Sequence, residues 1–138
     1  MKQLKKFCEN FTDEIPKRVE KIRNKYYQVP KNYVEIDERI EAKGIFLGEI
    51  KVTFKPSLYL LEWLSKRTEN KIYVNDKAEW LFLCGRDVFI ENIEKERIKS
   101  RIFLVQNEKD ENLGLGIEKE SMIKNLKDRG DFLRREMN

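Results

Sequence analysis

The apolar positions in the first half of the chain predict helices and short strands in turn. A first helix is indicated by apolar residues at helical spacing: Leu4, Phe7, Cys8 and Phe11. A second helix, capped by Thr12 or Asp13, is indicated in the same way by Ile15, Val19 and Ile22. Short strands are predicted at residues 26–29, 34–36, 45–48 and 50–54. A short helix is predicted over 37–43, and a stronger one from 56 or 57 to 67.

The second half of the chain has one helix among short strands. Residues 71–74 alternate as a strand does, residues 76–84 have helical spacing, and Gly85 ends that helix. Further strands are predicted at 88–93, 102–106, 113–117 and 122–126, with a polar turn at 107–112 and a helical turn at 128–135. This series is typical of a small mixed barrel. We place the domain boundary at residues 68–70, where the pattern is polar.

Composition argues against catalysis. The chain has 138 residues and no histidine, which removes the commonest general base and the commonest metal ligand. Cys8 and Cys84 are too few for a structural zinc site, and both are expected to be buried free thiols. No cofactor loop is recognisable. We therefore expect no catalytic residue, no metal and no cofactor. No apolar run approaches the ~20 residues of a membrane span, and no export signal follows Met1, so a cytoplasmic protein is expected.

Charge is distributed unevenly along the chain. The net charge is +4 and the isoelectric point is about 9.0. Residues 1–68 carry 15 basic and 10 acidic residues, whereas residues 69–138 carry 14 and 15. A polyanion site in the second half must therefore be a local cluster. The high content of Lys and Glu is typical of a thermophile's surface.

The first candidate site is the turn after the predicted helix at 76–84. The helix stops at Gly85, Arg86 is displayed at the turn, and an apolar strand begins. Backbone N–H groups of such a turn, together with Arg86, can hold a phosphate. A plain helix stop with Arg86 paired to Asp87 explains the same residues, so both interpretations stay open.

Two further segments carry candidate chemistry. Gly114 and Gly116 fall on one face of a strand, which permits close approach of a ligand or tight packing inside a barrel. The third glycine of a dinucleotide site is missing. The closing segment is basic and can grip phosphates, unless it is simply a solvated tail. Its basic residues are Lys124, Lys127, Arg129, Arg134 and Arg135.

In this order, the three segments resemble the PUA domain, a small RNA-binding pseudobarrel, and above all the Nip-seven family of ribosome biogenesis proteins. The matching stretches are residues 75–89, 113–116 and 128–134, with an upstream continuation through 44–63. The N-terminal helix region matches poorly, and the loop at 117–122 is shorter than in eukaryotic members. The resemblance implies an α+β fold. Residues 1–68 would form a small α/β domain with an antiparallel sheet, and residues 69–138 a PUA-like mixed β pseudobarrel.

The resemblance also implies a function. We expect a non-catalytic, archaeal-type RNA-binding factor in pre-rRNA maturation and large-subunit assembly, with rRNA or pre-rRNA as its partner and no membrane contact. Phosphate contacts are expected at Arg86, Lys124, Lys127, Arg129, Arg134 and Arg135. The basic N-terminal half would assist RNA binding or dock a protein partner in a pre-ribosomal complex. Two alternatives stay open: a non-catalytic RNA-binding subunit of a tRNA- or rRNA-modifying enzyme, and a protein-interaction module without RNA.

Overall fold

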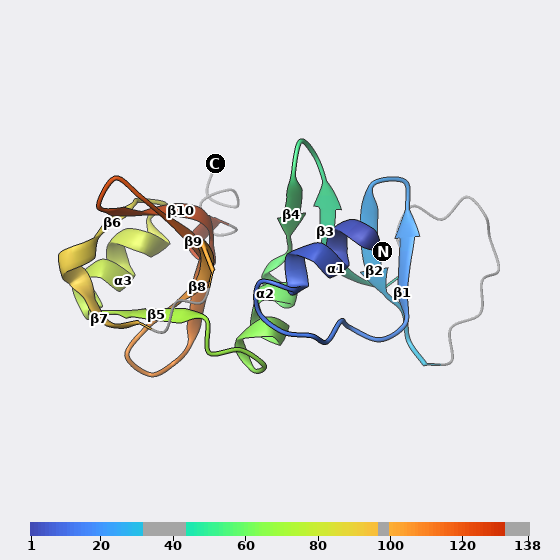
Figure 1. The fold of residues 1–138 in the computed structure, drawn as a ribbon, viewed down its shortest axis with the longest axis horizontal. Coiled ribbons are helices and arrows are strands. Elements are labelled where there is room, and N and C mark those ends of the chain that lie inside the picture. The colour runs from blue at the N-terminus through green and yellow to red at the C-terminus, as the bar shows by residue number, and fades with distance from the viewer. Residues whose placement is uncertain (32–43, 97–99, 132–138) are drawn as a thin grey trace.

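The protein consists of two sheets connected through one helix (Figure 1). The computed structural model describes residues 1–31, 44–96 and 100–131. The first sheet is antiparallel, in the order β1-β2-β3-β4. Its strands are β1 Val19–Ile22, β2 Lys25–Gln28, β3 Ile45–Ile50 and β4 Phe54–Pro56. Helix α1, Lys2–Cys8, and helix α2, Leu58–Ser65, pack against it.

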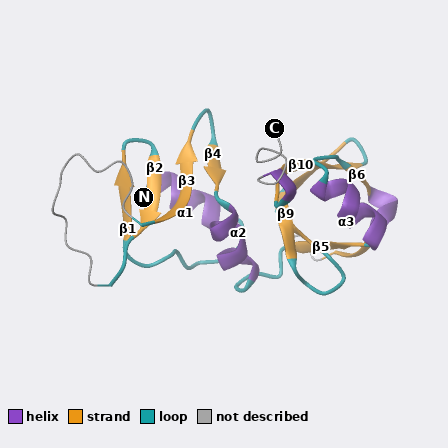
Figure 2. Cartoon of the chain, turned by 180° about the vertical axis from the view of Figure 1, so that it is seen from behind, coloured by secondary structure: helices purple, strands orange, loops and turns teal. Residues whose placement is uncertain are grey.

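The second sheet is mixed and curls around helix α3, Asp76–Leu83, as Figures 1 and 2 both show. Its order is β6-β10-β9-β8-β5-β7, and only β5 and β8 pair in parallel among the described strands. Its strands are β5 Lys71–Val74, β6 Val88–Phe89, β7 Ile93–Glu96, β8 Ile102–Gln106, β9 Asn112–Lys119 and β10 Met122–Asp128. A 3-10 turn, Ile90–Asn92, separates β6 from β7. The predicted α+β class, with an antiparallel N-terminal sheet and a PUA-like pseudobarrel, is confirmed.

Two apolar cores hold these sheets together. The barrel core is formed by side chains from α3 and the inner face of the sheet, among them Phe82 and Phe103. The other core lies between α1, α2 and the first sheet. Leu104 and Leu115 point out of the barrel and join this other core, so the two halves of the chain are packed on one another. The division into domains at residue 68 stays a prediction.

The helix predicted around Val19 is wrong. Residues 19–22 are strand β1, which forms a hairpin with β2. Arg18 and Arg23 flank the strand with φ values of 53° and 56°, which a right-handed helix does not permit. Val and Ile also favour a strand once a neighbouring strand is available. The strand predicted at 34–36 and the helix predicted at 37–43 lie outside the described residues.

Capping side chains set the starts of α2 and α3 where the sequence predicts them. The Ser57 hydroxyl accepts a hydrogen bond from the Leu60 N–H at 3.1 Å. The Asn75 side-chain oxygen accepts one from the Ala78 N–H at 2.9 Å. Each cap satisfies a donor that the first turn of a helix leaves without a partner.

The two cysteines differ, although both were expected to be buried. Cys8 is buried on the inner face of α1, and burial, followed by the neighbouring Glu9, raises its pKa to about 12. Cys84 is exposed because it is the last residue before the glycine turn, where α3 ends at the barrel surface. No helix in the described part of the chain is long and apolar enough to cross a membrane.

Candidate nucleic-acid interface

The turn after α3 is built by glycine. Gly85 has a φ of +85°, in the left-handed region that residues with a Cβ seldom adopt. This lets the Gly85 N–H donate to the Phe82 carbonyl at 2.9 Å and the Arg86 N–H to the Leu81 carbonyl at 3.1 Å. The chain thereby leaves the helix sharply and presents the exposed Arg86 before entering β6.

Asp87 joins this turn to β10. Its carboxylate accepts a hydrogen bond from the Asn125 N–H at 2.8 Å and pairs with the Lys124 ammonium at 3.2 Å. The Asn125 side-chain amide in turn donates to the Phe82 carbonyl at 2.9 Å. Further along, a Cβ on Gly130 would overlap the carbonyl oxygen of Leu83, so the chain after β10 passes directly against the end of α3. The glycine turn and the basic closing segment therefore meet in space.

The structure places four of the six predicted phosphate contacts. Arg86 and Arg129 are exposed, while Lys124 and Lys127 are half-buried on β10. Arg129 donates to the Asn112 carbonyl at 3.2 Å, at the far end of β10 from Lys124. Arg134 and Arg135 lie outside the described residues. The role of all six residues in binding phosphate stays a prediction.

The pairing of Asp87 bears on the two interpretations of this turn. An ion pair between Arg86 and Asp87 was the alternative to a phosphate site. In the structure Asp87 is paired with Lys124 instead. Within the described part of the chain, the guanidinium of Arg86 and the ammonium of Lys127 form no ion pair. These two charges can therefore meet an anion without first giving up a carboxylate among those residues.

The glycine pair of β9 serves packing. A Cβ on Gly114 would overlap the carbonyl oxygen of Lys127, and the φ of Gly114 is +154°. A Cβ on Gly116 would lie 2.9 Å from the Ile123 Cγ2 and 3.1 Å from the Val105 Cγ2. The glycines thus let neighbouring strands and core side chains come close, and no room for a ligand is left on that face.

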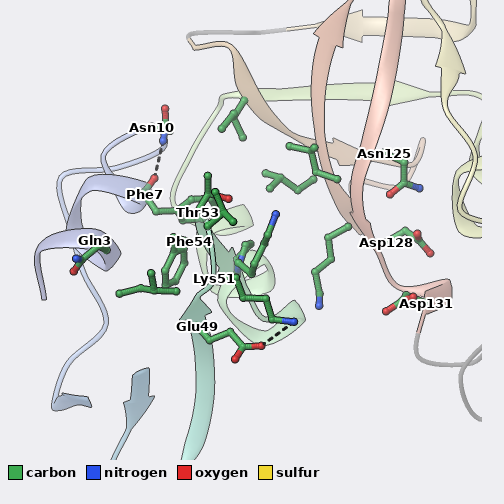
Figure 3. A pocket seen from close by; sticks show the side chains of 18 of the residues that line it. Gln3, Phe7, Asn10, Glu49, Lys51, Thr53, Phe54, Asn125, Asp128 and Asp131 are labelled. Atoms are coloured by element: carbon green, nitrogen blue, oxygen red, sulfur yellow. Dashed lines mark hydrogen bonds and ion pairs between the residues drawn. The ribbon is translucent and has the colours of Figure 1, made fainter. Parts of the chain in front are cut away.

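A cleft of about 1040 Å³ separates the β3–β4 hairpin from β10. Figure 3 shows Lys51, Thr53 and Phe54 of the hairpin on one side and Asn125 and Asp128 on the other. The cleft reaches Gly85 and is therefore continuous with the glycine turn. The cleft could not be predicted from the sequence because it depends on how the two sheets pack together.

The part of the chain that forms the second sheet is similar to known PUA domains. The family model described as the UPF0113 PUA domain matches residues 70–137. Residues 70–137 are thus similar in sequence to the PUA domain of UPF0113 proteins. The PUA domain is generally an RNA-binding domain.

A UPF0113 protein of Archaeoglobus fulgidus is 34% identical over 105 residues, covering 66% of this chain and 60% of that protein. The chain thus aligns with less than two thirds of the relative's length. A solved conserved PUA domain protein from Thermoplasma acidophilum superimposes with a TM-score of 0.54 at 20% identity. It covers 67% of this chain and 70% of that one, and shows the likeness of fold.

Two exposed aromatic residues of the PUA domain were not singled out from the sequence. Trp80 on α3 is 66% exposed and Phe89 on β6 is 56% exposed. Phe89 lies opposite Met122 in the sheet, so it shares the outer face of β10 with Lys124 two residues further on. The only sequence signal was position, because alternation along the strand puts Phe89 outside once Val88 is inside. Among the described residues, no group of three or more acidic or cysteine side chains that would hold a metal is found.

Proposed function

We propose that this chain binds RNA through its PUA domain, as a non-catalytic factor in ribosome biogenesis that acts in pre-rRNA maturation and large-subunit assembly. The binding surface would be formed by the Gly85–Asp87 turn and the outer face of β10, here called the turn–strand surface. The observation that carries the proposal is the contact between these two segments through Asp87. This contact keeps Arg86 of the turn close to the lysines of β10, although they are far apart in the sequence.

The chemistry of this surface suits a sugar–phosphate chain. Arg86 offers a planar fork of N–H donors, and such charge-assisted hydrogen bonds are worth about 1.5–3 kcal/mol before desolvation. Lys127 adds a point charge from the neighbouring strand. Phe89 lies near Lys124 on the same sheet and offers a ring to an unstacked base, as in other proteins that bind single-stranded RNA.

The role in ribosome assembly is supported by the order and spacing of motifs that resemble the Nip-seven family. The absence of histidine supports a non-catalytic role, because proton transfer near neutral pH most often uses that residue.

Binding itself is tested by fluorescence anisotropy with labelled rRNA fragments over a range of salt concentrations. The double variant Arg86→Gln/Lys127→Gln is compared with Lys77→Gln/Lys109→Gln, which removes the same charge from exposed positions elsewhere in the PUA domain. If both residues contact phosphates, the first variant makes the negative slope of log K against log salt shallower by about 1.4 for single-stranded RNA. The control should leave the slope unchanged. Equal behaviour of the two variants would contradict the proposed surface.

The role in assembly is tested by crosslinking the protein to RNA in cells of its source and sequencing what is recovered. Precursors of large-subunit rRNA are expected. Recovery of mature tRNA alone would contradict the proposal and favour a subunit of a tRNA-modifying enzyme.

A further inference from the structure

The cleft beside the PUA domain is lined by lysines from three separate elements. Lys6 comes from α1, Lys51 and Lys55 from the β3–β4 hairpin, and Lys127 from β10. Lys127 reaches the cleft because it pairs with Leu115, whose side chain packs against the first sheet. The packing of the two halves of the chain therefore creates this concentration of positive charge.

The carboxylates of the cleft offset only part of this charge. Glu49 pairs with Lys51 at 3.7 Å, and Asp128 is buried at the end of β10. Lys6, Lys55 and Lys127 form no ion pair with another residue in the described ranges. These three lysines line the cleft, and Asp131 is the third carboxylate that lines it.

Apolar side chains lie in the same cleft and are left in water. Val52 at the tip of the hairpin is fully exposed, and Phe46 and Leu126 are also exposed. The Phe46 ring packs beside Tyr27 with their centroids 5.8 Å apart, so it is held in place. Phosphate-binding cations next to exposed apolar and aromatic side chains are typical of surfaces that bind single-stranded nucleic acid.

We propose that this cleft holds a single-stranded stretch of the RNA that the PUA domain binds, with its phosphates at Lys6, Lys55 and Lys127. The bases would lie against Phe46 and Val52. This inference rests on the proposed function and extends it to the N-terminal half of the chain. The RNA strand would continue from the turn–strand surface, because Gly85 and Asn125 also line the cleft.

The shape and chemistry of the cleft favour a single strand. Its volume of about 1040 Å³ lies just above the ~300–1,000 Å³ of small-molecule pockets, which suits an extended chain. A duplex keeps its base faces stacked inside and would leave Phe46 and Val52 without a partner. An acidic peptide could use the same lysines, and the experiment below separates this occupant from RNA.

The test compares two double variants of the full chain that remove the same charge. Lys6→Gln/Lys55→Gln changes the cleft, whereas Lys17→Gln/Lys25→Gln changes two exposed lysines that do not line it. Affinity is measured for labelled oligouridine of about 15 nucleotides, near the upper site size of one single-strand-binding module, and for an RNA hairpin with a fully paired stem. Losing two phosphate contacts is expected to weaken oligouridine binding about 25-fold at ~0.1 M salt, with convergence near 1 M.

The control variant should bind both RNAs as the parent does, and the cleft variant should keep its affinity for the hairpin. A second measurement does not depend on a variant: photocrosslinking of 4-thiouridine-substituted oligouridine should modify Phe46 or its neighbours in β3. The cleft is not the site of single-stranded RNA if the cleft variant binds oligouridine as the parent does and the crosslinks are confined to the turn–strand surface. The proposed function would still stand in that case. If the parent binds neither RNA, the proposed function fails as well. Competition by polyglutamate but not by unlabelled oligouridine identifies an acidic peptide as the occupant and overturns this inference.

Discussion

A buried lysine in β5 allows one prediction to be worked out in detail. The Lys71 side chain is only 8% exposed, and its ammonium lies 3.2 Å from the Asp110 carboxylate in the β8–β9 turn. The same carboxylate accepts hydrogen bonds from the Tyr73 hydroxyl at 2.9 Å and from the Gln106 amide at 3.0 Å. The substitution Asp110→Asn keeps the shape and an acceptor, and asparagine tolerates the φ of 61° found at this position. It therefore removes little besides the charge opposite Lys71.

The expected cost lies between two known limits. Breaking a fully buried ion pair costs about 3–5 kcal/mol, whereas an exposed pair is worth about 0–1 kcal/mol. Lys71 is buried but the Asp110 side chain is 54% exposed, so water screens the pair from one side. We expect Asp110→Asn to lower the free energy of unfolding by about 1–2 kcal/mol near neutral pH. Urea unfolding of Asp110→Asn, Lys71→Met and the double variant measures this, and the double variant should recover part of the loss.

The loss should also depend on pH. Burial alone would raise the pKa of Asp110, but the hydrogen bonds from Gln106, Tyr73 and Lys71, with the charge of Lys71, lower it overall. A lowered pKa in the folded state gives stability that is complete above the unfolded value of about 3.9 and is lost as pH falls through the folded pKa. The difference between parent and Asp110→Asn should therefore shrink in acid. A variant as stable as the parent at neutral pH, or a penalty that does not change with pH, would refute the reasoning. Asp13→Asn, at an exposed position, is the control.

Three further outcomes follow from the fold. Ser57→Ala removes the N-cap of α2 and should destabilise the protein by about 1 kcal/mol in urea unfolding, with no change in the slope. Gly114→Ala should destabilise it far more than Gly116→Ala, because the first meets backbone at a φ of +154° and the second meets side chains; thermal unfolding of both variants checks the order. Iodoacetamide should modify the exposed Cys84 in the native protein and leave Cys8 unmodified until unfolding, since burial raises the pKa of Cys8 to about 12; peptide mass mapping reads this directly.

Local patterns were sufficient to predict most of the PUA domain. Strand β5, helix α3 and strand β8 match the predicted ranges, because alternation marks the strands and Gly85 marks the end of the helix within a few residues. Strands β9 and β10 extend slightly beyond their predicted ends. The predicted strand at 88–93 is interrupted by a 3-10 turn, since neighbouring strands pair with its two ends separately.

The N-terminal half was harder to predict because its pattern fits two structures. Ile15, Val19 and Ile22 have helical spacing, yet pairing with β2 makes residues 19–22 a strand. Such a tertiary contact overrides a weak local preference. The same limit applies to the site. The sequence identified Arg86 and the basic closing segment, but the pairing of Asp87 with Lys124 depends on folding.

The proposed function depends on RNA lying on the turn–strand surface of the PUA domain. Proton–nitrogen NMR spectra of the labelled full chain, recorded as an rRNA fragment is added, test it most directly. We expect the amide signals of residues 85–87 and 123–127 to shift first and most strongly, and added salt to reverse the shifts. Shifts confined to α1 and the β1–β2 hairpin, with the signals of residues 85–87 unmoved at saturation, would contradict it.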